Sequence, residues 1–218
     1  RPEVRYGRSR LDFCLDGHHL VEVKGVTLEQ DGRCRFPDAP TERGTRHLHE
    51  LIRAVEEGYQ ATAFFVIQME NALDFAPNDD TDPAFGQALQ THVGKQFEAV
   101  CGQWVVRANA KGELPFLASS FGRWWGTDSR EKTETDIDLI AANKEAKAIL
   151  LGECKWRNSF NESRAIELLE HRAPLVKGYS DRSFYLFTKE PVSEATQAKA
   201  KVRKDLTLVT ADEMLEAR

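Results

Sequence analysis

The sequence predicts an α/β fold of two tandem domains, each with a mixed central sheet flanked by helices. Two stretches, 10–30 and 137–156, alternate apolar and polar residues as β-hairpins do. Each is followed by a helical pattern and then by a short apolar run typical of a buried strand, at 62–68 and 183–188. The two halves therefore repeat one order of elements, although their sequences are not close duplicates.

The first half is expected to contain a hairpin, a helix and a buried strand. The turn signal Asp16-Gly17 separates strands over 10–16 and 19–30. A helix is predicted from Thr41 to Gly58, with four apolar residues on one face and a glycine at its end. The expected remaining elements are the buried strand over 62–68, a loop over 75–82 and a short helix opened by Asp82-Pro83.

The pattern restarts around His92 to Gly94, which places the boundary between predicted domains of residues 1–92 and 93–218. Residues 95–108 have the apolar spacing of a helix. Pro174 limits a later helix that begins at Ser163. The other expected elements are strands over 116–126, 137–142, 148–156, 183–188 and 206–209, a helix over 193–203 and a terminal helix from Ala211.

Length and composition exclude several classes of protein. The chain has 218 residues, which suits one large domain or two small ones, and 41% of them are hydrophobic, enough to bury a core. No apolar run approaches the ~18 residues of a membrane span, so no membrane partner is expected. The four cysteines form no Cys-x-x-Cys pair and predict reduced core thiols in a cytoplasmic protein. The chain begins with Arg1 instead of Met, which indicates a fragment or a processed form.

The net charge of −5 argues against a simple basic nucleic-acid binder. The charge is unevenly spread, because residues 54–92 contain seven acids and no Arg or Lys. A locally positive cleft on an acidic protein can still bind phosphate, although ordinary solvated charge explains the same composition.

An Asp…Glu-x-Lys pattern lies across each predicted hairpin. Side chains two positions apart on a strand share a face, so Glu22 and Lys24 project together while Val23 points into the core. Asp12 lies on the strand paired with Glu22. The hairpin is expected to bring the two carboxylates together.

The second hairpin repeats the pattern. Glu153 and Lys155 share a face, Cys154 points inward, and Asp138 lies on the paired strand. Two close carboxylates bind a hard cation such as Mg²⁺ or Mn²⁺, which lowers the pKa of a water molecule and neutralises phosphate charge. The lysine would orient that water or stabilise the transition state. The alternative in each half is a cross-strand salt bridge on a solvated sheet face.

Further residues are candidates for the same chemistry. Glu98, on the predicted helix before the second Asp, is a candidate extra site residue or a surface residue. Arg suits phosphate geometry, which makes Arg10, Arg43 and Arg46 candidate nucleic-acid contacts. Trp124-Trp125 could stack on bases, although core packing is expected for at least one. The sequence contains no phosphate-cradling Gly-x-x-x-x-Gly-Lys-[Ser/Thr] loop, so ATP hydrolysis by this chain is not expected.

Residues 9 to about 90 resemble the carboxy-terminal domain of the sugar fermentation stimulation protein A family. The matching segments are Ser9–Phe13, Val21–Lys24, Val26-Thr27, Phe36–Gly44, His47-Leu48, Glu50-Leu51, Phe65–Gln68 and Asp82-Pro83. The resemblance implies a nuclease-like fold, DNA binding and metal-site roles for Asp12, Glu22 and Lys24. Members of that family carry a preceding OB-like domain and a further strand near residue 90, so this domain is expected to be truncated.

Residues 94–218 resemble a different family, the nuclease-like domain at the carboxy end of certain prokaryotic, often archaeal, AAA-type ATPases. The matching segments are Gly94–Glu98, Gly122–Gly126, Ile137-Asp138, Gly152–Trp156, Gly178-Tyr179 and Tyr185–Phe187. The resemblance makes Glu98 a site residue beside Asp138, Glu153 and Lys155. It also implies an ATPase subunit as a candidate partner. The join of the two families indicates a natural fusion, an engineered chimera or an assembly artefact, and the sequence leaves these open.

Together these observations predict tandem restriction-endonuclease-like (PD-(D/E)XK) domains that hydrolyse DNA with Mg²⁺ or Mn²⁺. Asp12, Glu22, Asp138 and Glu153 would hold metal. A DNA-binding, regulatory nuclease fold without cleavage is the first alternative, and a protein-interaction domain with remnant sites is the second. A homodimer is compatible with the sequence.

Overall fold

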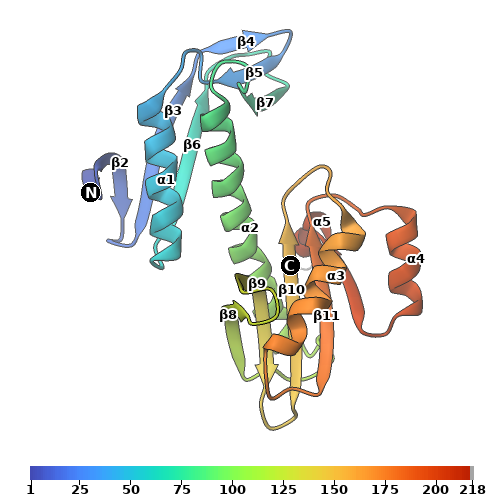
Figure 1. Cartoon of the computed structure of the whole chain (residues 1–218). Coiled ribbons are helices and arrows are strands. Elements are labelled where there is room, and N and C mark those ends of the chain that lie inside the picture. Colours follow the sequence, from blue (N-terminus) through green and yellow to red (C-terminus); the bar gives the residue numbers. More distant parts are fainter. Residues whose placement is uncertain (217–218) are drawn as a thin grey trace. The chain divides into compact units, whose positions relative to one another are not determined.

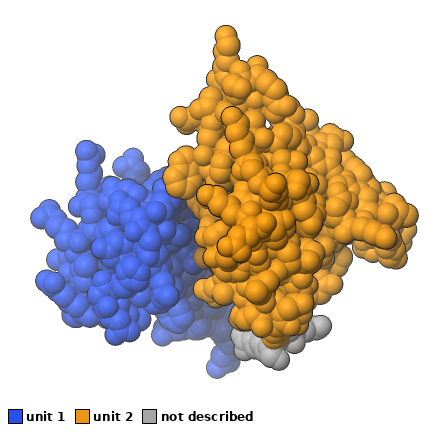
Figure 2. Space-filling model, turned by 90° about the horizontal axis from the view of Figure 1, so that it is seen from below, with its two compact units in different colours: residues 1–96 blue, residues 97–218 orange. Residues whose placement is uncertain are grey.

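The computed structural model describes residues 1–216 and divides the chain into two compact units (Figure 2). The N-terminal unit comprises residues 1–96, and the C-terminal unit begins at Phe97. Each is a mixed α/β structure in which helices flank a sheet of parallel and antiparallel strands. Within residues 1–216, no helix combines the length and apolarity needed to cross a membrane.

The N-terminal unit has a four-stranded sheet in the order β1-β2-β3-β6 and a three-stranded sheet in the order β4-β5-β7 (Figure 1). Strands β3 and β6 are parallel, whereas β1-β2 and β2-β3 are antiparallel. The elements are β1 (Pro2–Tyr6), β2 (Ser9–Leu15), β3 (His19–Val26), β4 (Leu28–Gln30), β5 (Arg33–Phe36), α1 (Glu42–Glu56), β6 (Gln60–Ile67), β7 (Asp74–Pro77) and the first half of α2 (Pro83–Lys111).

The first predicted hairpin is confirmed as β2-β3. Asp16 and Gly17 both have positive φ, 50° and 71°, which suits a tight hairpin turn. The predicted second strand is too long, because β3 ends at Val26 and β4 belongs to the other sheet. The predicted loop over 75–82 is wrong in part, because β7 pairs in parallel with β5, a distant contact that local sequence does not reveal.

Helix α1 confirms the helix expected between Thr41 and Gly58. Thr41 is its N-cap and accepts a hydrogen bond from the Gly44 amide at 3.0 Å. A Cβ on Gly44 would lie 2.9 Å from the Thr41 side chain, so this close approach favours glycine. The apolar face of α1 packs on the sheet through fully buried residues such as Leu48 and Leu51.

Helix α2 corrects the expectation of two separate helices. It runs unbroken for 29 residues from Pro83 to Lys111 and contains the predicted join at His92 to Gly94. Its first half buries Phe85 and Leu89 in the N-terminal unit, and its second half buries Cys101 and Val105 in the C-terminal unit. The apolar pattern of the sequence changes phase between these pairs and therefore resembles a restart.

The C-terminal unit has a five-stranded sheet in the order β12-β11-β10-β9-β8. Strands β10, β11 and β12 are parallel neighbours, and β8-β9 and β9-β10 are antiparallel. This unit confirms its predicted order of strands and helices. The elements are β8 (Ser120–Asp128), β9 (Thr133–Asn143), β10 (Ala148–Lys155), α3 (Glu162–Arg172), a short 3-10 turn (Ala173–Leu175), β11 (Asp181–Thr188), α4 (Glu194–Val202), β12 (Leu206–Thr210) and α5 (Ala211–Glu216).

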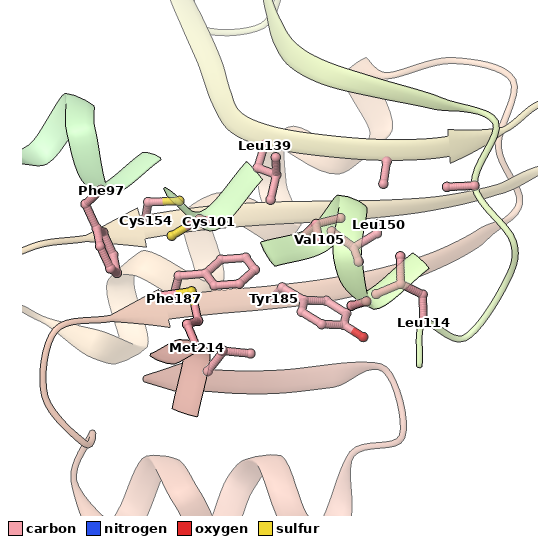
Figure 3. Close-up of a cluster of buried hydrophobic side chains, with 14 residues drawn as sticks. Phe97, Cys101, Val105, Leu114, Leu139, Leu150, Cys154, Tyr185, Phe187 and Met214 are labelled. Carbon is pink, nitrogen blue, oxygen red and sulfur yellow. The ribbon is translucent and has the colours of Figure 1, made fainter. Parts of the chain in front are cut away.

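Both faces of the C-terminal sheet are covered. One face, drawn in Figure 3, packs against α2 and α5 through residues that include Cys101, Cys154, Phe187 and Met214. The other packs against α3 and includes Ile166. The four cysteines of the chain are buried free thiols.

The sheet of the N-terminal unit has one apolar core, on the α1 side. On the opposite face Phe13, Leu15 and Phe64 are 43%, 46% and 55% exposed. The prediction that 62–68 is a buried strand is therefore wrong, because its residues are half-buried or exposed and Phe64 is the most exposed hydrophobic residue of β6. Val23 was expected in the core, but it is only half-buried and pairs with Phe64, whereas Glu22 faces α1 and is 3% exposed.

Candidate active sites on the two hairpins

In the N-terminal unit, β3 places Glu22 and Lys24 on one face. The Lys24 Nζ lies 2.5 Å from the Glu22 Oε1, and the side chains are only 13% and 4% exposed. The strand alternation that predicted this pairing is confirmed. Such a contact is shielded from water, unlike the solvated salt bridge of the alternative interpretation.

Asp12 joins this pair from β2. The β2-β3 ladder ends at the pair of Phe13 and Val21, the positions next to Asp12 and Glu22. The Asp12 Oδ2 accepts a hydrogen bond from the Val23 amide at 2.7 Å. A backbone donor therefore holds the Asp12 carboxylate against the centre of the Glu-x-Lys segment.

His47 completes the N-terminal cluster and was missed by sequence reasoning. Its imidazole is 2% exposed, and its Nδ1 lies 2.5 Å from the Glu22 Oε1. The Glu22 Oε1 thus contacts both Lys24 and His47, while the buried Glu22 Oε2 has no hydrogen-bond partner among the described residues. The available signal was a histidine next to Leu48 on the apolar face of the predicted helix.

The C-terminal unit repeats the arrangement on β9 and β10. The Asp138 Oδ2 accepts from the Cys154 amide at 2.8 Å, and the Lys155 Nζ lies 2.5 Å from the Glu153 Oε1. The β9-β10 ladder ends at the pair of Leu139 and Gly152, the positions next to Asp138 and Glu153. The two hairpins therefore present the same three functional groups with the same backbone contact.

Arg172 at the end of α3 was also missed by sequence reasoning. Its Nη1 lies 3.5 Å from the Glu153 Oε2, an ionic contact without a hydrogen bond. Burial raises the pKa of Glu153 and the charge of Asp138 raises it further, whereas Lys155 and Arg172 lower it. The negative charge of Asp138 beside the buried Glu153 favours a cation between the two side chains.

Glu98 lies on α2 in the neighbourhood of this site. Its Oε2 is 3.8 Å from the Arg123 Nη2. A hydrogen bond with Cys101 and burial raise the pKa of the Cys154 thiol, and the charges of Asp138 and Glu98 add to that effect. Both carboxylates therefore lie near that thiol, and the role of Glu98 stays a prediction.

The three candidate phosphate-binding arginines have different surroundings. Arg10 is 3.4 Å from Glu3, and both side chains are largely exposed. Arg43 is exposed on α1. Arg46 lines a cavity of about 660 Å³ beside the first turns of α1 and α2. Their contact with nucleic acid stays a prediction.

The tryptophan pair divides between two environments. Trp124 packs against the core on the α3 side, and Trp125 is 79% exposed. The expectation that at least one packs in the core is confirmed, and Trp125 is the residue available for stacking.

The donor set of each hairpin fits a magnesium or manganese ion. Each site offers two carboxylates, and its glutamate has one buried oxygen without a hydrogen-bond partner among the described residues. Hard divalent cations prefer oxygen ligands, and Mg²⁺ keeps several waters beside one or two carboxylates. Within residues 1–216, no group of three or more His, Cys, Asp or Glu side chains is arranged to hold a metal, so water would complete the coordination.

Two family models match the chain. Residues 1–110, half of the 218 residues, match the family described as the sugar fermentation stimulation protein RE domain. Residues 63–166 match a family described as archaea bacterial proteins of unknown function. The second match begins before the predicted boundary, and the two overlap along most of α2.

Individual relatives match the same N-terminal part. A sugar fermentation stimulation protein homologue of Clostridium botulinum is 53% identical over 92 residues, covering 40% of each chain. A homologue from a Thermoanaerobacter species is 51% identical over 100 residues, covering 44% of each. The structure of Pyrococcus furiosus SfsA in complex with Ca²⁺ is 33% identical, with a TM-score of 0.41, and the match covers 44% of this chain and 42% of that one. The chain thus spans less than half the length of these relatives.

Proposed function

The chain belongs to the sugar fermentation stimulation protein family, and on that premise we propose that it is a DNA-binding nuclease that requires Mg²⁺ or Mn²⁺. In this proposal each unit is a restriction-endonuclease-like domain, and each hairpin is an active centre. The chain spans 40% of the length of the Clostridium botulinum relative. The proposal therefore concerns the activity of this chain and not that of the longer protein.

One observation carries the proposal. Both hairpins place an Asp and a Glu on adjacent strands, with a Lys Nζ 2.5 Å from the glutamate. Both glutamates are at least 95% buried and yet keep one oxygen without a hydrogen-bond partner among the described residues. A buried carboxylate oxygen without a hydrogen bond is costly unless a ligand satisfies it, and the ionic contact of Arg172 with the Glu153 Oε2 offsets only part of that cost in the C-terminal unit.

The residues of each hairpin have distinct roles in the proposed reaction. Asp12 and Glu22, and likewise Asp138 and Glu153, would hold the ion. When bound, it would lower the pKa of a water molecule and neutralise charge on the phosphate. Lys24 and Lys155 would orient the attacking water or stabilise the negative charge of the transition state as point charges. The backbone amides of Val23 and Cys154 keep the aspartates in place.

Cleavage of a panel of plasmid, linear and single-stranded DNA and of RNA tests the proposal. We expect nicking in Mn²⁺ that disappears in EDTA. Glu22→Gln and Glu153→Gln should each remove one active centre, and the double variant should lose cleavage by more than the ~100-fold that loss of an outer-shell partner costs. The matched control is Glu167→Gln, an exposed glutamate on α3. Cleavage that persists in the double variant refutes the proposal.

The second candidate function is DNA binding without cleavage. It is favoured because each site offers only two carboxylates, and because each lysine is already paired with its glutamate. A gel shift that persists in EDTA, with no product in Mn²⁺, would support this candidate. An ATPase partner and a homodimer stay predictions. Sedimentation of the purified chain with and without DNA measures its oligomeric state and so tests the homodimer.

A further inference from the structure

The contact between α1 and Glu22 is the strongest feature that the proposed reaction does not use. His47 is buried in the face of α1 that packs on the sheet. Its Nδ1 reaches the Glu22 Oε1 at 2.5 Å, the same oxygen that Lys24 contacts at 2.5 Å. Two groups from different elements thus hold one oxygen of the carboxylate.

We propose that His47 is a positioning residue that fixes the Glu22 carboxylate so that its Oε2 is available to a divalent cation. The carboxylate can rotate about its terminal torsion, and Lys24 alone, on the same strand, leaves that rotation open. A second contact from α1 selects one orientation. The two oxygens of Glu22 accordingly differ in their contacts: Oε1 has two partners, and the buried Oε2 has no hydrogen-bond partner among the described residues.

In the C-terminal unit a different side chain reaches the glutamate from the helix that follows the hairpin. Arg172 reaches Glu153 from the end of α3, but it approaches Oε2 at 3.5 Å, whereas Lys155 holds Oε1. Its charge therefore lies beside the oxygen that a cation would need. His47 instead leaves the corresponding oxygen of Glu22 clear, so the positioning role belongs to the N-terminal site.

The inference rests on the proposed metal site, and its test measures cation binding instead of cleavage. Calorimetric titration with Mn²⁺ is carried out on the full chain carrying Glu153→Gln, which leaves the N-terminal site alone. His47→Leu removes the contact with similar bulk. His47→Asn restores a side-chain donor near the position of Nδ1. Thermal unfolding in EDTA of each variant reports folding separately from binding.

We expect His47→Leu to weaken Mn²⁺ binding by about tenfold or more, as losing an outer-shell partner of a ligand does. His47→Asn should stay within about threefold of the Glu153→Gln background, because its amide can restore the contact. Equal affinity of the leucine variant and the background overturns the positioning role alone. Equal losses in the leucine and asparagine variants, with both still folded, also overturn it. If the background binds no Mn²⁺, both this inference and the proposed N-terminal metal site fail.

Discussion

The two units place the same motif in sheets that are covered differently. The central residue of each Glu-x-Lys segment pairs with a phenylalanine on the parallel neighbour, Val23 with Phe64 and Cys154 with Phe187. Phe64 is 55% exposed, whereas Phe187 is 0% exposed beneath α2 and α5. The geometry of the Asp…Glu-x-Lys motif therefore does not depend on whether helices cover the opposite face of the sheet. The hairpin and the helix on the glutamate side suffice to build it.

The strand pairing also shows which residues of the two aromatic strands β6 and β11 correspond. The similar strings that begin at Phe64 and Phe184 suggest that these two residues correspond. The register shows that Phe64 corresponds to Phe187, because both face the middle of Glu-x-Lys. Aromatic composition predicted the strands, and only the pairing fixed their positions.

The largest expected effect comes from truncating these two phenylalanines. Phe187→Ala should destabilise the C-terminal unit by about 3–5 kcal/mol, because a fully buried aromatic leaves a cavity. Phe64→Ala should cost less than about 1 kcal/mol, since the ring is already in water. Urea unfolding of both variants measures the difference. Equal losses would mean that the outer face of β6 is covered in solution.

A second difference lies in the response to acid. His92 on α2 is 3% exposed in the N-terminal unit, and its Nδ1 has no hydrogen-bond partner among the described residues. Burial lowers the pKa of His92 from 6.5 to about 4. The pKa of His92 is therefore lower in the folded chain than in the unfolded chain. The neutral imidazole contributes fully to the stability of the fold above pH 6.5, and this contribution is lost as the pH falls through about 4.

The expected loss from His92 is about 3 kcal/mol over that window. The C-terminal unit should behave differently. The Arg130 side chain holds the pKa of Asp128 well below its usual range. The contribution of the ionised Asp128 to the stability of the C-terminal unit is therefore lost only at a lower pH than that of His92. Hydrogen exchange of peptides from residues 1–96 between pH 7 and pH 4 measures the effect. His92→Leu should flatten the pH dependence, and an unchanged slope would contradict the assignment to His92.

The smallest effect concerns Arg172. Replacing Arg172 with Gln in a chain that also carries Glu22→Gln should tighten Mn²⁺ binding at the C-terminal site. The gain should be on the order of 1 kcal/mol, as for one ionic interaction in a partly solvated setting. Calorimetry measures it, and Arg164→Gln, at an exposed position of the same helix, is the control. Weaker binding in the Arg172 variant would mean that Arg172 supports the site instead of competing with the cation.

The sequence by itself determined the parts of the site that depend on local geometry. Strand alternation put each Glu and Lys on one face, and the Asp16-Gly17 turn closes the hairpin whose strands carry Asp12 and Glu22. These features follow from a period of two and from turn chemistry, which act over a few residues.

Only the tertiary structure decided which side chains surround those carboxylates and which faces are covered. His47 and Arg172 reach the glutamates across 25 and 19 residues of chain, through helix packing that no local pattern encodes. The continuity of α2, the pairing of β7 with β5 and the exposure of Phe64 have the same origin. Each depends on which distant surfaces bury one another, and the free energy of that burial belongs to the assembled unit and not to any one segment.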